Sequence, residues 1–201
     1  MKPSPPEHPD SVYRSGGNPW GYCSERHQER FQAALDMLGR ACPGRAAFTL
    51  EIGCSEGLFT ELLASRTDHL LAVDISGLAL ERAQNRLIQN TNVQFEQFDL
   101  LAGKLERRFD LVVAMDVLPY FQRRGEIRRA SENIVCSVAD RGVLLLSVTR
   151  PPAGVVEGPW WSSLLPRGKG ILDQFDLDHR LEVLERRTTT SHYLGTYRKK
   201  S

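Results

Sequence analysis

The sequence has no apolar run long enough to cross a membrane. Its longest runs, such as LLAVDI and GVLLLSV, fall far short of the roughly 20 residues that a transmembrane helix requires. The first residues, MKPSPPEHPDS, also lack the apolar core of a secretory signal peptide. These two absences predict a protein with no membrane partner and a cytoplasmic location.

Paired cysteines and excess charge are also missing. The four cysteines, Cys23, Cys42, Cys54 and Cys136, are scattered and form no C-x-x-C pair. This pattern argues against a metal cage or a disulfide framework, so we predict no metal. The net charge of +1 gives no general attraction to nucleic acid. The stretch RRGEIRRA has no interleaved aromatic residues, and we interpret it as a solvated helix face rather than a nucleic-acid site.

Strand-like and helix-like segments alternate along most of the chain. Residues 1–18 are rich in proline, serine, glycine and charge and predict a mobile tail. Residues 24–38 have the apolar spacing of an amphipathic helix. The expected strands are 46–53, 69–75, 92–99, 108–118 and 142–149, and the helices between them are 57–66, 76–90 and 124–139. After a loop rich in proline and glycine, residues 181–199 are typical of two short strands joined by a tight turn.

This alternation predicts an α/β fold. Strands that alternate with helices form a parallel sheet through right-handed crossovers, with helices on both faces. We therefore expect a Rossmann-like, doubly wound, seven-stranded and mostly parallel sheet with an antiparallel edge strand. A chain of 201 residues suits one such domain. We place it over residues 19–201, with residues 19–45 as an N-terminal helical cap.

The turn after the first strand, in LEIGCSEGLFT, identifies the expected ligand site. Gly53 and Gly57 let the backbone approach a ligand closely, and in a doubly wound sheet this turn faces the binding crevice. A phosphate-binding P-loop would end in G-K-[ST], but this turn ends in Gly-Leu-Phe. A dinucleotide fingerprint needs three glycines where this chain has Gly53, Ser55 and Leu58. The pattern E-x-G-x-x-x-G instead resembles the first motif of class I S-adenosylmethionine-dependent methyltransferases.

That resemblance implies S-adenosyl-L-methionine as cofactor. Asp74 ends the second strand about twenty residues past the turn, where a carboxylate can accept both ribose hydroxyls. By the same resemblance, Asp99 faces the adenine amine and Met115 lies at the methionine end. The full set of expected cofactor-binding residues is Glu51, Gly53, Cys54, Gly57, Asp74, Ile75, Asp99, Leu100 and Met115.

A closer resemblance covers more of the chain. The segments NPWGYCSERHQERFQAAL, LEIGCSEGLFTELLA and FDLVVAMDVLPYF are similar to the nodulation protein S group of N-methyltransferases. The known substrates of that family are amino sugars of chitin-like oligosaccharides. The resemblance therefore implies N-methylation of an amino sugar or a deacetylated chitooligosaccharide, with a small molecule or oligosaccharide as the partner.

Methyl transfer to an amine requires a neutral nitrogen, aligned opposite the sulfur and shielded from water. A carboxylate, phenol or imidazole can orient the amine or accept its proton. The candidates for this catalytic role are Asp116, Tyr120, Glu25 and His27. The candidate walls of the substrate pocket are Trp20, Tyr22 and Trp160.

Three alternatives remain open from the sequence. The chain could be a binding module that keeps the fold without activity, although the intact turn and Asp74 argue against this. It could be a nucleotide-dependent oxidoreductase, although the third glycine is absent. Among methyltransferases, the alternative is O- or N-methylation of another small natural product.

Overall fold

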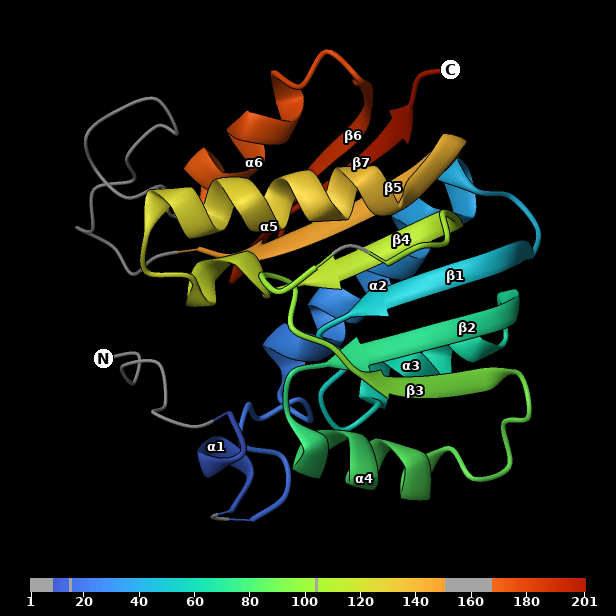
Figure 1. The fold of residues 1–201 in the computed structure, drawn as a ribbon, viewed down its shortest axis with the longest axis vertical. Helices are drawn as coiled ribbons and strands as arrows, with labels where there is room; N and C mark the ends of the chain where they lie inside the picture. Colours follow the sequence, from blue (N-terminus) through green and yellow to red (C-terminus); the bar gives the residue numbers. More distant parts are fainter. Residues whose placement is uncertain (1–8, 15, 104, 151–167) are drawn as a thin grey trace.

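A computed structural model describes residues 9–14, 16–103, 105–150 and 168–201. Its centre is one seven-stranded sheet with the strand order β3-β2-β1-β4-β5-β7-β6 (Figure 1). The strands are β1 (Ala46–Ile52), β2 (Thr67–Asp74), β3 (Val93–Gln97), β4 (Phe109–Met115), β5 (Val138–Thr149), β6 (Leu181–Thr188) and β7 (His192–Lys199). The strands β1 to β5 pair in parallel, whereas β7 is antiparallel to both of its neighbours. The predicted fold class is confirmed.

Helices cover both faces of this sheet. The helices α2 (Glu25–Ala41) and α3 (Leu58–Ala64) pack on one face, and α4 (Gly77–Arg86) packs beside them on β2. The opposite face carries α5 (Arg124–Ser137) and α6 (Lys169–Asp176). Two short elements, α1 (Ser11–Arg14) and the 3-10 turn η1 (Leu118–Tyr120), lie outside these layers. Among the described residues, no helix has both the length and the apolar character that a membrane crossing needs.

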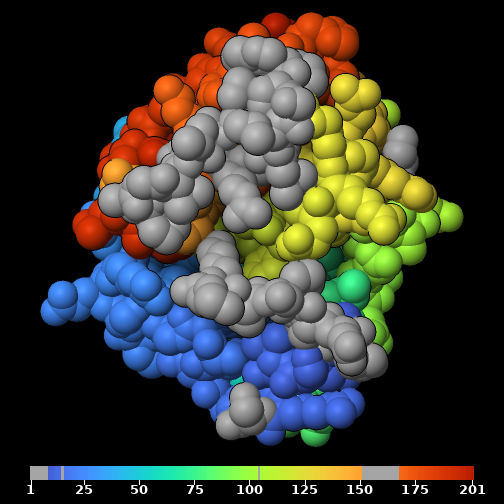
Figure 2. All heavy atoms as spheres, turned by 90° about the vertical axis from the view of Figure 1, so that its left-hand side faces the viewer, coloured from blue at the N-terminus to red at the C-terminus, as the bar shows by residue number. Residues whose placement is uncertain are grey.

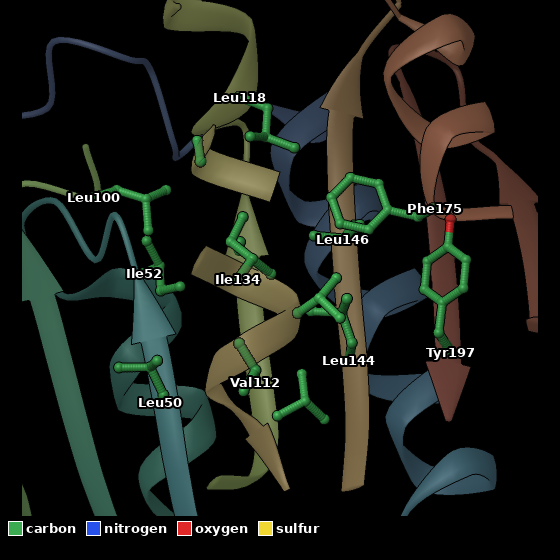
Figure 3. Packing of buried hydrophobic residues seen from close by; sticks show 14 of the residues in the cluster. Leu50, Ile52, Leu100, Val112, Leu118, Ile134, Leu144, Leu146, Phe175 and Tyr197 are labelled. Carbon is green, nitrogen blue, oxygen red and sulfur yellow. The ribbon is translucent and has the colours of Figure 1, made fainter. Parts of the chain in front are cut away.

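The core follows from the alternation of side chains along each strand. Leu50 and Ile52 of β1 face the layer of α5 and α6, together with Val112 and Leu144 (Figure 3). The neighbouring positions of the central strands point the other way. Leu111 and Val113, for example, pack with α2 and α3. Burial of the central strands on both faces fixes the register of the strand ends, where the candidate site lies.

Three elements differ from the sequence predictions. The helix α6 falls in a stretch that we expected to be a loop. It is only eight residues long, but Ile171, Leu172 and Phe175 form a buried stripe. The strand β5 begins at Val138, directly after α5, rather than at residue 142. The helix α4 ends at Arg86, four residues before the predicted end, and its expected cap is present because Ser76 Oγ accepts from Ala79 N.

The part of residues 1–18 that the structure describes makes specific contacts with the domain. Tyr13 is buried, and its carbonyl oxygen accepts from Arg82 Nη2 at 2.6 Å. Asn18 N donates to Glu56 Oε2 at 2.7 Å. Composition alone indicated a tail, but one aromatic side chain and several backbone hydrogen bonds dock this segment against α4 and the glycine turn.

Candidate active site

The glycine turn connects β1 to α3 and needs glycine at two positions. Gly53 and Gly57 have φ angles of 75° and 80°, which L-residues with a side chain rarely adopt. A Cβ atom on Gly53 would lie 2.5 Å from Val117 Cγ2, and one on Gly57 would lie 2.8 Å from Leu87 Cδ1. The turn is held against β2 because Gly53 N and Cys54 N both donate to the Val73 carbonyl oxygen.

Asp74 ends β2 next to this turn. Its carboxylate accepts from Ser55 N and from Ser76 N, each at 2.9 Å and each on a different oxygen. Burial raises the pKa of Asp74, and these backbone N–H groups work in the opposite direction. Each carboxylate oxygen can accept one more hydrogen bond. The acceptor capacity that remains on this carboxylate fits a vicinal diol such as that of ribose.

Glu51 lies inside β1 and is the most unusual acid of the site. Its side chain is 4% exposed, and its Oε2 atom has no hydrogen-bond partner among the described residues. Burial raises its pKa to about 8. A buried carboxylate oxygen without a partner is costly unless a donor or a cation arrives. Glu51 therefore fits the amino group of a bound amino acid moiety, as S-adenosylmethionine would supply.

The other expected cofactor residues occupy the same edge of the sheet. Ile75 is exposed directly after β2. Past β3, Asp99 is exposed and accepts from Leu101 N, whereas the next residue, Leu100, is buried. Met115, at the end of β4, lines a cavity of about 20 Å³ together with Cys54 and Tyr22.

Two further observations concern the Cys54 thiol and the possible metal ligands. Burial raises the pKa of the Cys54 thiol well above its usual range, so it is a packing residue rather than a nucleophile. In the described part of the chain, no group of three or more His, Cys, Asp or Glu side chains is arranged to hold a metal ion.

Asp116, just after β4, is held by three partners. Arg30 of α2 pairs with its Oδ2 atom, and His192 Nε2 of β7 lies 3.0 Å from the same oxygen. The Thr149 hydroxyl of β5 donates to Oδ1 at 2.7 Å. Burial alone would raise the pKa of Asp116, but the hydrogen bond from His192 and the charge of Arg30 hold it far below its usual range. The carboxylate is thus a fixed anion, which argues against proton acceptance by Asp116 and leaves the other expected role, orientation of the amine.

The remaining catalytic candidates lie in different environments. Tyr120 is 41% exposed on η1, and burial of its phenol raises its pKa, so it stays protonated near neutral pH. His27 is buried between the rings of Tyr22 and His192. Burial and the charge of Arg30 lower its pKa to about 4, which makes it a neutral imidazole. Glu25 is exposed in the first turn of α2.

Two of the three expected pocket walls are described. The Trp20 ring packs edge-on against Tyr120, with 5.5 Å between ring centroids. Its indole N–H also donates to the Tyr13 hydroxyl at 3.2 Å. Tyr22 stacks on Phe31. Trp160 lies outside the described residues.

The sequence predictions missed several residues at this site. Tyr13 donates its hydroxyl to Ser55 Oγ at 2.9 Å, which places the N-terminal segment directly on the glycine turn. Arg30, Thr149 and His192 surround Asp116. Only Arg30 carried a signal, because it lies on the apolar face of its helix, where a charge requires a partner.

Figure 2, which views the carboxyl ends of the parallel strands, shows the N-terminal segment and α2 in blue opposite α5 in yellow.

The sheet order, the reversed β6–β7 hairpin and a site at the strand ends define the class I methyltransferase fold. Within this class, the family model described as Nodulation protein S matches residues 15–191, and the chain belongs to this family. Both resemblances that the sequence suggested are confirmed at this level.

Two relatives illustrate the similarity. The nodulation protein S of Bradyrhizobium diazoefficiens is 32% identical over 134 residues, covering 66% of this chain and 63% of the relative. That of Rhizobium tropici is 30% identical over 141 residues, covering 70% and 56%. The matched part of this chain thus spans less than two thirds of the length of these relatives.

One solved structure matches over nearly its whole length. It is the N-methyltransferase NodS from Bradyrhizobium japonicum WM9, in complex with S-adenosyl-L-homocysteine. The TM-score is 0.79 at 25% identity, and the match covers 93% of this chain and 94% of that one.

Proposed function

We propose that this chain is an S-adenosylmethionine-dependent methyltransferase that methylates the amine of an amino sugar or a deacetylated chitooligosaccharide. The observation that carries the proposal is the buried, unpartnered oxygen of Glu51, next to the glycine turn and Asp74. Membership of the nodulation protein S family supports the amine as acceptor. So does the printed name of the Bradyrhizobium japonicum structure, an N-methyltransferase.

The cofactor side of the site follows from these groups. When bound, S-adenosylmethionine supplies a methyl group on a positively charged sulfur. Glu51 accepts hydrogen bonds from its amino group, and Asp74 accepts the two ribose hydroxyls. The turn from Gly53 through Cys54 to Gly57 lets the backbone come close, since no side chain projects from either glycine.

The adenine and the methionine ends are held by residues further along the same edge. Exposed Ile75 offers an apolar contact to the adenine face, and buried Leu100 supports the loop after β3. Asp99 accepts from the exocyclic amine. Met115 and Tyr22 bound the methionine end, because both line the small cavity beside Cys54.

The acceptor side aligns the amine and excludes water. Trp20 and Tyr22 form walls, and Trp160 remains an expected third wall. Tyr120 is at the opening, where its protonated phenol orients the acceptor nitrogen. Glu25, exposed on α2, attracts the ammonium form of the acceptor.

The two remaining catalytic candidates, Asp116 and His27, have a supporting role in this arrangement. Asp116 is a fixed anion, and His27 is a neutral imidazole whose Nδ1 atom has no described partner. We assign them to orientation rather than to proton transfer, because neither changes its charge near neutral pH. The rate should therefore rise with pH as the acceptor amine itself loses its proton.

An acceptor screen tests this proposal. The purified chain is incubated with S-adenosylmethionine and with glucosamine, deacetylated chitooligosaccharides, their acetylated counterparts or phenols. Mass spectrometry then locates the added methyl group. We expect methylation of the free amines only. Equal transfer to acetylated and deacetylated sugars would mean that oxygen is the acceptor, and transfer to phenols alone would favour another small natural product.

Two negative expectations belong to the same proposal. We expect full activity in the presence of a chelator, because methyl transfer from a sulfonium needs no Lewis acid. Loss of activity with EDTA and its return with magnesium would contradict this. We also propose a cytoplasmic location without a nucleic-acid partner. The free state of all four cysteines supports a reducing compartment, and cell fractionation tests it.

A further inference from the structure

The backbone of Asp116 has a left-handed conformation just after β4. Its φ angle is 60°, which few residues other than glycine adopt. Such a conformation persists only where the surrounding structure fixes it, and it is concentrated at active sites. The Asp116 N–H donates to the Ser147 carbonyl oxygen of β5 at 2.8 Å. The backbone of Asp116, as well as its side chain, is therefore anchored to the neighbouring strand.

The turn that begins at Asp116 brings Tyr120 to the opening of the candidate active site. Leu118, within this turn, is 2% exposed and belongs to the core (Figure 3). Tyr120 N donates to the Val117 carbonyl oxygen at 3.2 Å, which closes the turn. Burial and then the charge of Asp116 raise the pKa of Tyr120, so the carboxylate and the phenol are electrostatically coupled. The position of Asp116 thus determines where the Tyr120 ring emerges.

Thr149 and His192 together hold the Asp116 carboxylate. They lie directly opposite each other in the antiparallel pairing of β5 with β7, so their side chains project from the same face of the sheet. The Thr149 hydroxyl donates to Oδ1 at 2.7 Å, and His192 Nε2 donates to Oδ2 at 3.0 Å, because a carboxylate can only accept. The Ser191 hydroxyl lies 2.8 Å from the other ring nitrogen of His192. The orientation of the His192 ring is therefore fixed from both sides.

Direction and charge come from different partners of Asp116. Arg30 supplies the opposite charge. Thr149 carries no charge, and its hydroxyl adds a hydrogen bond of defined direction to the other carboxylate oxygen. Loss of this hydroxyl would therefore free the orientation of the carboxylate while the ion pair with Arg30 stays in place.

We propose that Thr149 and His192 are positioning residues for methyl transfer. They hold the Asp116 carboxylate in one orientation, and through the turn from Asp116 to Tyr120 they hold the phenol where it orients the acceptor amine. Neither residue contacts the acceptor itself. The assignment rests on the proposed function, because that function gives Tyr120 its role at the acceptor.

Fluorine NMR of the full chain labelled with 3-fluorotyrosine tests the positioning without any need for activity. The chain has five tyrosines, and Tyr120→Phe identifies the Tyr120 resonance by its loss. We expect Thr149→Val, which keeps the shape and removes the hydroxyl, to shift and broaden this resonance. Thr149→Ser should restore it.

Thr196→Val is the matched control for this measurement. Thr196 is fully buried in β7, and its hydroxyl has no partner among the described residues, so the Tyr120 resonance should not move. An unmoved resonance in Thr149→Val, or an equal shift in Thr196→Val, would overturn the proposal.

His192→Leu should shift the same resonance, because it removes the other donor. It also removes a buried ring that packs against His27, so Thr149→Val remains the deciding variant. An unmoved Tyr120 resonance in folded His192→Leu would overturn the assignment of His192.

Kinetics with a deacetylated chitooligosaccharide test whether Thr149 acts through Tyr120. We expect Thr149→Val to lower kcat/KM for this acceptor roughly threefold to tenfold, with the affinity for S-adenosylhomocysteine unchanged. In the Tyr120→Phe background the same substitution should have almost no further effect, because the two residues act on one group. Losses that multiply would overturn the proposal. If the unchanged chain methylated no acceptor, the proposed function would fail, and the fluorine spectra would still decide whether Thr149 positions Tyr120.

Discussion

The proposed cofactor side and the proposed acceptor side of the candidate active site are built in different ways. On the cofactor side, Glu51, Gly53 and Gly57 lie within seven residues of each other, and Asp74 is one strand away. On the acceptor side, Asp116 is held by Arg30, Thr149 and His192, which come from α2, β5 and β7. The first region is encoded in a local motif, and the second exists only after the chain has folded.

This difference has an electrostatic counterpart. The acids of the cofactor side have raised pKa values because they are buried without enough partners, so they are prepared for a ligand. The acid of the acceptor side has a lowered pKa because its partners are already present. The acids of the cofactor side can therefore still take hydrogen-bond donors from a ligand. On the acceptor side, the ion pair of Asp116 with Arg30 instead holds α2 on the sheet.

The largest expected effect concerns Arg30. We expect Arg30→Met to lower the free energy of unfolding by about 3–5 kcal/mol, because it leaves the Asp116 carboxylate buried with less compensation. Arg26→Met is the matched control on the exposed side of the same helix. Urea unfolding measures both. Equal stability of Arg30→Met and Arg26→Met would show that the pair of Arg30 with Asp116 does not hold α2 on the sheet.

A smaller effect is expected from His27, whose folded-state pKa of about 4 lies below its unfolded value of 6.5. Between these values the unfolded state binds more protons, so the neutral ring's contribution to stability is present above pH 6.5 and is lost as the pH falls to 4. We expect this contribution to be about 1–3 kcal/mol.

Glu51 acts in the opposite direction, since its raised pKa makes stability fall as the pH rises toward 8. The free energy of unfolding must therefore be measured as a function of pH for both His27→Gln and the unchanged chain. His69→Gln, at an exposed histidine, is the control. Parallel profiles for His27→Gln and the unchanged chain would show that His27 is not held neutral.

The smallest effect is a proton released on ligand binding. Glu51 has a pKa of about 8 and is mostly protonated at neutral pH. The amino group of S-adenosylhomocysteine is a cation and should lower this pKa, so binding should release up to one proton. Calorimetry in two buffers with different ionisation enthalpies detects this. Glu51→Gln should abolish the release. Binding without proton release would remove Glu51 from the amino group's position.

The residues of the proposed cofactor side are easier to recognise in the sequence than those around Asp116, for a physical reason. Backbone conformation restricts Gly53 and Gly57 to glycine, and Asp74 must end a strand, so these residues can be recognised from their spacing. The fold class could likewise be predicted, because alternating apolar segments fix the order of strands and helices.

The partners of Asp116 could not be predicted in this way. Thr149 and His192 are ordinary residues at strand ends, and only the pairing of β5 with β7 brings them together. The contacts of the N-terminal segment could not be predicted for a similar reason. Its composition is that of a tail, but the Tyr13 hydroxyl donates to Ser55 of the glycine turn and the Tyr13 carbonyl oxygen accepts from Arg82 of α4. The helix α6 was missed because a helix of about two turns is too short to show a clear hydrophobic periodicity in the sequence.

Calorimetric titration of S-adenosylhomocysteine into the unchanged chain, Asp74→Ala and Asp68→Ala tests the central claim most directly. Asp68 is an exposed acid near the other end of β2 and serves as the matched control. We expect the unchanged chain and Asp68→Ala to bind equally. Asp74→Ala should lose roughly 1.5–3 kcal/mol of binding free energy, which is about tenfold to hundredfold in affinity. Equal affinity of all three, or no binding by the folded unchanged chain, would contradict the account.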